Sequence, residues 1–209
     1  MALISRTTSR VPSSTSEPRA EGCKSLGLKA LFEVLDPNRK YSFLDLGPVL
    51  GPNIEFLSRY ASKIRVENLY WTLAGQQFFE RGDECVDETA FDRMLSPPSH
   101  ERFEIILSWD VLNYFRPEEV RVLVRYLERL CLPGSFFFAI ISTLKEMPVV
   151  PMSFRILDTE TLLYTTDSAE TRPCRRYAPR DLGLLMSGFQ AHSSYMLRNG
   201  MQEYLFVRN

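Results

Sequence analysis

Apolar and polar positions in the first third of the chain follow the periods of helices and strands in turn. CKSLGLKALFEVLD, residues 23–36, places its apolar side chains near one helical face. YSFLDLG, residues 41–47, is typical of a short buried strand that ends in glycine. The amphipathic run at 52–63 predicts a helix, and IRVENLY at 64–70 predicts the next strand. The order is helix, strand, helix, strand.

The second half of the chain continues this alternation. FEIIL at residues 103–107 and SFFFAIIS at 135–142 are apolar enough for strands that are buried on both faces of a parallel sheet. Between them, a helix is predicted to begin at Pro117 and to end at a Pro-Gly turn. Residues 143–178 carry short alternating runs and turn residues, which predict a hairpin-like insert.

The end of the chain carries a strong turn signal. A helix is predicted from Pro179, and the two strands after it are joined by Asn199-Gly200, the strongest short-range hairpin signal. Residues 71–102 are ambiguous: TLAGQQFFERG favours a helix, whereas DETAFDRML fits a helical turn or a weak third strand. The pattern predicts one α/β domain with an antiparallel C-terminal hairpin.

Composition agrees with one ordinary globular domain. The chain has 209 residues, of which 44% are apolar and 24% charged, enough for one α/β core and short for two. Residues 1–22 are rich in Ser, Thr, Arg and Pro, so a flexible tail is expected, with a transit peptide or a phosphorylation target as the alternative. The folded domain is expected to span residues 23–209.

Charge and cysteine usage narrow the classes of function. Lys plus Arg total 25 against 26 acidic residues, so the formal net charge of -1 gives no reason to expect a nucleic-acid partner. The four cysteines form no C-x-x-C pair, which argues against a metal site and a disulfide framework. No apolar run approaches the about 20 residues of a membrane span. We expect a cytoplasmic protein with reduced thiols and no membrane partner.

The candidate chemistry is concentrated in the segment FLDLGPVLGPNIEFL. Strand, glycine loop, helix, second strand and acid form the arrangement that binds a nucleoside-bearing cofactor. Glu67 follows the second strand about 20 residues after the first glycine, where a carboxylate can bind ribose hydroxyls. Four further candidates for cofactor binding lie in the loop: Asp45, Gly47, Gly51 and Asn53. Strand-end carboxylates also cap helices, so a structural role for Asp45 and Glu67 is the alternative.

This segment resembles the first motif, D-x-G-x-G-x-G, of the class I S-adenosylmethionine (SAM)-dependent methyltransferases. Residues 103–140 are similar to the family's later strand, turn, helix and fifth strand, and the resemblance covers about residues 26–209. It implies a Rossmann-like, seven-stranded, mostly parallel sheet with helices on both faces. It also implies SAM as the cofactor and residues 143–178 as a cover over the methyl acceptor.

The resemblance adds candidates near the later strands. Asp92 corresponds to an adenine contact, with a surface acid or a helix cap as the alternative. Trp109 and Asp110 follow a buried strand and are expected at the carboxyl edge of the sheet, where ligands bind. At that edge, Trp109 is expected either to pack or to contact cofactor or substrate. The same two interpretations apply to Asn113 and Tyr114.

The glycine loop departs from the family's pattern at Pro48, Val49 and Pro52. Val49 replaces the middle glycine, which in the family lies closest to the methionine part of SAM, and the prolines remove backbone donors. Two functions therefore stay open. One is SAM-dependent methyl transfer to a small-molecule or protein acceptor. The other is a non-catalytic binding or scaffold protein that has lost SAM binding and acts through a protein partner.

Other motifs carry weaker signals. GPVLGPN fits the G-x-G-x-x-G pattern of nicotinamide-dependent oxidoreductases no better than the methyltransferase motif. His192 precedes two serines, but without a G-x-S-x-G elbow no nucleophilic triad is predicted. RPCRRY, residues 172–177, predicts either an anion contact or a solvated basic turn. The sequence identifies no catalytic residue and carries no signal for the oligomeric state.

Overall fold

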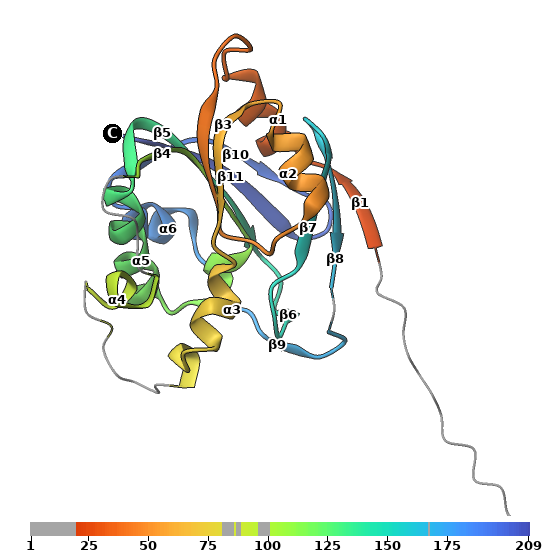
Figure 1. Ribbon diagram of the computed structural model, residues 1–209. Helices are drawn as coiled ribbons and strands as arrows, with labels where there is room; N and C mark the ends of the chain where they lie inside the picture. The colour runs from red at the N-terminus through yellow and green to blue at the C-terminus, as the bar shows by residue number, and fades with distance from the viewer. Residues whose placement is uncertain (1–19, 81–85, 87–88, 96–100, 167) are drawn as a thin grey trace, which may run out of the picture.

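A six-stranded sheet forms the centre of the protein in a computed structural model that describes residues 20–80, 86, 89–95, 101–166 and 168–209. Its strand order is β10-β11-β5-β4-β2-β3 (Figure 1). β2 pairs in parallel with β3 and β4, and β4 with β5, whereas β11 runs antiparallel to β5 and β10. The strands span β2 Tyr41–Asp45, β3 Ala61–Val66, β4 Phe103–Trp109, β5 Cys131–Ser142, β10 Phe189–Met196 and β11 Met201–Arg208.

The prediction of a seven-stranded, mostly parallel sheet is corrected to a six-stranded mixed sheet within the described residues. The ambiguous part of the chain contributes helices: α3 (Leu69–Ala74), the short 3₁₀ helix η1 (Phe78–Glu80) and α4 (Ala90–Leu95). Ala90, Phe91 and Leu95 are buried, as the helical period places them on one side of α4. In the described part of the chain, β3 is therefore the edge strand on the parallel side, and β10 is the opposite edge.

Helices cover both faces of the sheet, as predicted (Figure 1). Helices α1 (Leu26–Glu33) and α2 (Gly51–Leu57) pack on one face, while α4, α5 (Pro117–Arg129) and α6 (Pro179–Leu185) pack on the other. Each face carries its own apolar cluster, so the inner strands β2, β4 and β5 are largely buried on both sides. Among the described residues, no helix combines the length and the apolar character that crossing a membrane requires.

The segment between β5 and α6 forms two small antiparallel sheets. β6 (Glu146–Pro148) pairs with β9 (Thr171–Pro173), and β7 (Ser153–Asp158) pairs with β8 (Thr161–Thr165). β1 (Ala20–Lys24) adds to the other edge of β8 and completes a three-stranded sheet. This strand begins inside the predicted tail, whose residues 1–19 lie outside the described residues. Of the insert strands, β7 and β8 pack on the α1 and α2 side of the central sheet.

The elements with the strongest local signals begin where the sequence places them. α5 begins at Pro117, and the carboxylate of Glu119 accepts a hydrogen bond from the backbone N–H of Arg116 at 2.7 Å. β10 and β11 form the predicted hairpin, and Gly200 in its turn has a φ of 77°. These two predictions are confirmed.

Candidate functional site

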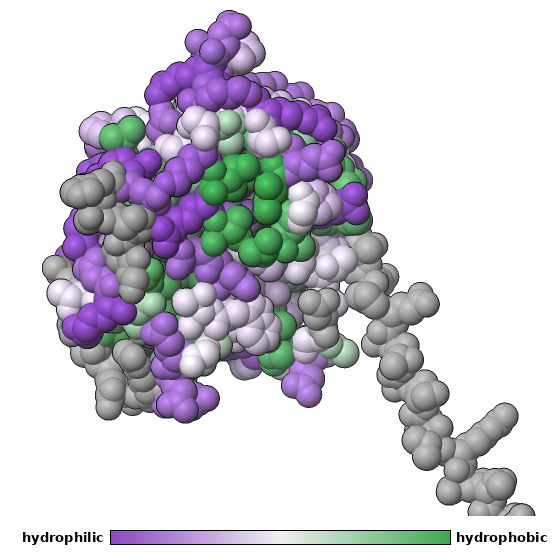
Figure 2. All heavy atoms as spheres, viewed as in Figure 1, coloured by the Kyte–Doolittle hydropathy of each residue, from purple (hydrophilic) through white to green (hydrophobic). Residues whose placement is uncertain are grey.

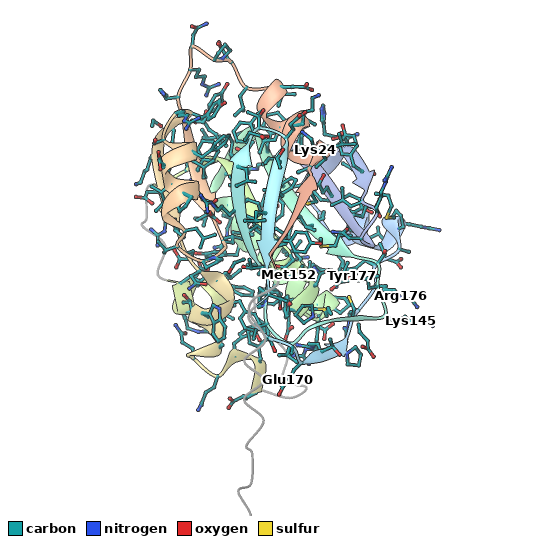
Figure 3. All side chains as sticks on the ribbon, turned by 90° about the vertical axis from the view of Figure 1, so that its right-hand side faces the viewer. Lys24, Lys145, Met152, Glu170, Arg176 and Tyr177 are labelled. Carbon is teal, nitrogen blue, oxygen red and sulfur yellow. The ribbon has the colours of Figure 1, made fainter. Side chains whose placement is uncertain are left out.

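Two neighbouring cavities lie at the carboxyl edge of the parallel strands, the edge where open α/β sheets bind ligands. The loop cavity, of about 130 Å³, is lined by residues 46–48, 68, 70–71, 109–111 and 150–153. The insert cavity, of about 140 Å³, is lined by residues 110, 113–114, 142, 144, 146–148, 152, 164, 199 and 201. Asp110 and Met152 line both, and Figure 3 shows Met152 at the ends of the insert strands.

Asp45, at the end of β2, is a buried carboxylate whose partners belong to the protein itself. Its Oδ1 accepts hydrogen bonds from Nε1 of Trp109 at 2.6 Å and from the backbone N–H of Gly47 at 2.9 Å. Burial raises the pKa of Asp45 to about 6, and these two bonds limit the rise because they favour the ionised form. The carboxylate expected to contact a cofactor is therefore held by an indole.

Trp109 fills the space beside the glycine loop. Its ring stacks on Phe154, with 5.5 Å between centroids and 5° between planes. Its φ of 52° lies in the left-handed region, which costs about 1 to 3 kcal/mol for a residue other than glycine. A Cβ on Gly47 would lie 2.7 Å from Cδ1 of Trp109. Gly47 is thus needed to admit this ring.

Val49 and Gly51, the other residues of the loop motif, do not line the loop cavity. Val49 is 65% exposed. Figure 2 shows a patch of apolar surface over the region of β3 and α2. Gly51 opens α2, and a Cβ built on it meets no atom within 4 Å. The valine that replaces the middle glycine therefore does not narrow the cavity, whereas Trp109 is part of its wall.

Asn53 is buried in α2 and binds the backbone of the insert. Its Nδ2 donates to the carbonyl oxygen of Phe154 at 2.8 Å, and its Oδ1 accepts from the N–H of Ile156 at 2.8 Å. Both hydrogen-bonding ends of the amide face β7. Asn53 consequently lies outside the two cavities and attaches the insert strand to the helix that follows the glycine loop.

Glu67 and Asp92 form ion pairs away from both cavities. Oε2 of Glu67 accepts from Nε of Arg65 at 2.9 Å, and the two residues line a separate cavity of about 10 Å³. Asp92 in α4 accepts from Arg129 at 2.7 Å. The ion pair of Arg65 and Glu67 could have been predicted from the sequence, because residues i and i+2 of an extended segment share a face.

Asp110 is the predicted residue that lines both cavities, and it is 3% exposed. Its Oδ2 accepts a hydrogen bond from the backbone N–H of Met152 at 3.1 Å. Burial raises the pKa of Asp110 to about 7, and the N–H groups of Met152 and of Asp110 itself limit the rise. Sequence reasoning missed Met152 and Phe154, since nothing in their local pattern indicates what β7 packs against.

The remaining candidates have structural contacts. Asn113 donates to the carbonyl oxygen of Ile140 at 3.0 Å. The hydroxyl of Tyr114 donates to the carbonyl oxygen of Val150 at 2.7 Å. His192 is exposed on β10. Arg172 lies over the ring of Tyr114 and lines an open cavity of about 410 Å³. Within the described ranges, no three His, Cys, Asp or Glu side chains are grouped as metal ligands.

The fold is that of the class I SAM-dependent methyltransferases, as the sequence resemblance predicted. An S-adenosylmethionine-dependent methyltransferase from Clostridium acetobutylicum ATCC 824 matches with a TM-score of 0.53 and 13% identity, over 88% of this chain and 90% of that chain. The PH0226 protein from Pyrococcus horikoshii OT3 matches with a TM-score of 0.51 and 13% identity, over 86% of each chain. No protein-family model and no curated protein matches the sequence.

The residues around the glycine loop do not fit SAM in this arrangement. The loop cavity of about 130 Å³ is well below the about 300 to 1,000 Å³ of small-molecule pockets. The carboxylate of Asp45 is occupied by Trp109, and Glu67 is paired with Arg65 at a separate cavity. The two acids that the motif provides for the cofactor therefore do not converge on one space.

Proposed function

We propose that this protein is a non-catalytic binding protein with a methyltransferase-like fold, in which Trp109 closes the SAM cleft. The observation that carries this proposal is the hydrogen bond of 2.6 Å between Nε1 of Trp109 and Oδ1 of Asp45. The stacked ring of Phe154 supports the indole from the insert side. The working surface of the protein is then the adjoining insert cavity at the same edge of the sheet.

The energetic cost of reopening the cleft supports this proposal. A ligand in the place of Trp109 has to break a hydrogen bond to a charged group and an aromatic stack, together about 2 to 4 kcal/mol. That cost lowers affinity by about 30- to 1000-fold. The new ligand contacts also have to replace the burial of an indole that is 2% exposed. SAM binding is thus strongly disfavoured.

Calorimetric titration with SAM and with its demethylated product tests the proposal. We expect no heat at millimolar ligand for the natural chain. Trp109→Ala frees Asp45 and enlarges the cavity, so it should acquire measurable SAM affinity. Trp71→Ala is the matched control, because Trp71 lines the same cavity but is 52% exposed and should leave the cleft closed. Micromolar binding of SAM by the unaltered chain would refute the proposal. This measurement does not depend on the folding of a variant.

A second candidate function is SAM-dependent methyl transfer to a small-molecule or protein acceptor. It is favoured by the meeting of the two cavities at Asp110 and Met152, at the edge where this fold class binds ligands. In this candidate, the insert cavity holds the acceptor, and the insert has to move before a cofactor can enter. The same titration decides between the two functions.

A further inference from the structure

The carboxylate of Asp110 has an oxygen without a partner. Oδ1 is inaccessible to solvent and has no hydrogen bond to another described residue, while Oδ2 has one, from Met152. A buried ionised carboxylate costs several kcal/mol unless it is paired. Among the described residues, those that line the two cavities at Asp110 include neither Lys nor Arg. No described cationic side chain therefore faces Asp110 from these cavities.

The insert cavity beside Asp110 has the size and lining for a small organic molecule. Its about 140 Å³ is close to an engineered cavity of about 150 Å³ that binds benzene. Two tyrosines and three methionines contribute to its wall: Tyr114, Tyr164, Met147, Met152 and Met201. Aromatic faces attract cations, and methionine adapts to irregular apolar shapes. This lining suits a compact apolar body that carries one polar head.

The charges at the insert cavity select the sign of that head. Its two charged lining residues are both acidic, Asp110 and Glu146. Arg172 lies 6.0 Å from the ring centre of Tyr114 but lines the separate, open cavity. A cationic head is therefore attracted, and an anionic head is repelled and would leave Oδ1 unpaired.

We propose that the insert cavity binds a small organic ammonium ion with an apolar body, whose charged head pairs with the carboxylate of Asp110. This inference rests on the proposed binding function, because it assigns the ligand class to the cavity that Trp109 leaves open. A second carboxylate, Glu146, adds negative potential from the wall. The body of the ligand packs between the tyrosines and methionines of the wall.

Titration of the full chain with n-butylammonium chloride tests the inference, with n-butanol as the neutral probe of similar size. We expect saturable heat with butylammonium and none with butanol. Asp110→Asn keeps the shape of the side chain and removes its charge, so affinity should fall by about tenfold or more. The control Glu146→Gln changes an exposed carboxylate on β6 and should lower affinity less.

Three outcomes would overturn the inference: equal binding of butanol, unchanged affinity in Asp110→Asn, or no heat with butylammonium in the tens of millimolar. The comparison with butanol uses the unaltered chain and does not depend on the folding of a variant. A parallel titration with SAM separates the two proposals. Binding of SAM refutes the closed cleft. If neither SAM nor butylammonium gives heat, only the ammonium site is refuted.

Discussion

Gly47 and Gly51 belong to one motif, yet they stand in opposite environments. A Cβ on Gly47 would lie 2.8 Å from Nε1 of Trp109, whereas a Cβ on Gly51 meets nothing within 4 Å. The first glycine is required by a neighbouring side chain, and the second is required by no neighbour.

Gly47→Ala should therefore destabilise the protein by about 1 to 3 kcal/mol, as over-packing does. Gly51→Ala should destabilise it less, because its Cβ would meet no atom within 4 Å beyond the adjacent residues, and only the following Pro52 disfavours a helical alanine. Urea unfolding of the two variants measures this difference. Equal losses of stability in both variants would show that Trp109 does not pack against the loop.

The raised pKa values of Asp45 and Asp110 predict that stability falls as pH rises. Both pKa values lie above the ordinary 3.8, at about 6 and about 7, so the folded chain binds more protons than the unfolded chain between these limits. The stability they contribute is complete below about pH 4 and is lost as pH rises through about 7. Each pKa unit corresponds to about 1.4 kcal/mol.

Urea unfolding at about pH 5 and about pH 8 checks this linkage. The unaltered chain should lose stability between the two values, and Asp110→Asn should lose less because one of the two groups no longer titrates. Asp181→Asn, at an exposed carboxylate in the first turn of α6, should behave as the unaltered chain does. An identical slope in Asp110→Asn would contradict the buried, unpaired state of this carboxylate.

At the scale of elements, the attachment of β7 to α2 decides how the site is built. Asn53 satisfies a carbonyl and an N–H of β7 at once, at Phe154 and Ile156. The same strand places Phe154 against Trp109. The sequence suggests the insert as a cover for a methyl acceptor. In the structure, the insert also supports the ring of Trp109, which closes the proposed cofactor cleft.

Asn53→Ala should lower the free energy of unfolding by about 2 to 4 kcal/mol, because two buried backbone groups lose their partners. Amide hydrogen exchange at Ile156 should accelerate more than exchange in β5. Asn38→Ala, at an exposed asparagine, is the matched control and should change neither quantity. Unchanged exchange at Ile156 would show that β7 is held by other contacts.

The sequence predicts these elements well where the signal is local, and poorly where it is not. Pro117 starts α5 and Asn199-Gly200 turns the hairpin because caps and turns depend on a few adjacent residues. The closure of the cleft depends on β7, whose contacts with Asn53 cross 101 and 103 positions. The sequence places Asp45, Trp109 and Asp110 at one edge of the sheet. It does not predict which residues contact their side chains.

At the scale of the whole molecule, the central sheet separates two apolar clusters that have different origins. The cluster on the α5 side is built by helices that follow their strands closely in sequence. The cluster on the α1 side joins α1 and α2 to β7, β8 and β11, which come from distant parts of the chain. The candidate site lies where the second cluster reaches the edge of the sheet, so its shape depends on the least local part of the fold.

The contact between α1 and β11 joins the beginning of the described chain to its end. The N–H of Gly27 donates to Oε2 of Glu203 across 176 positions. On a ribosome that adds about 5 to 20 residues per second, Glu203 is made roughly 9 to 35 s after Gly27. Leu28 and Leu31 are fully buried in the folded protein. During that interval β11, against which α1 packs, has not yet been made. The core on the α1 side is therefore completed only after β11, the last strand of the described chain, has been synthesised.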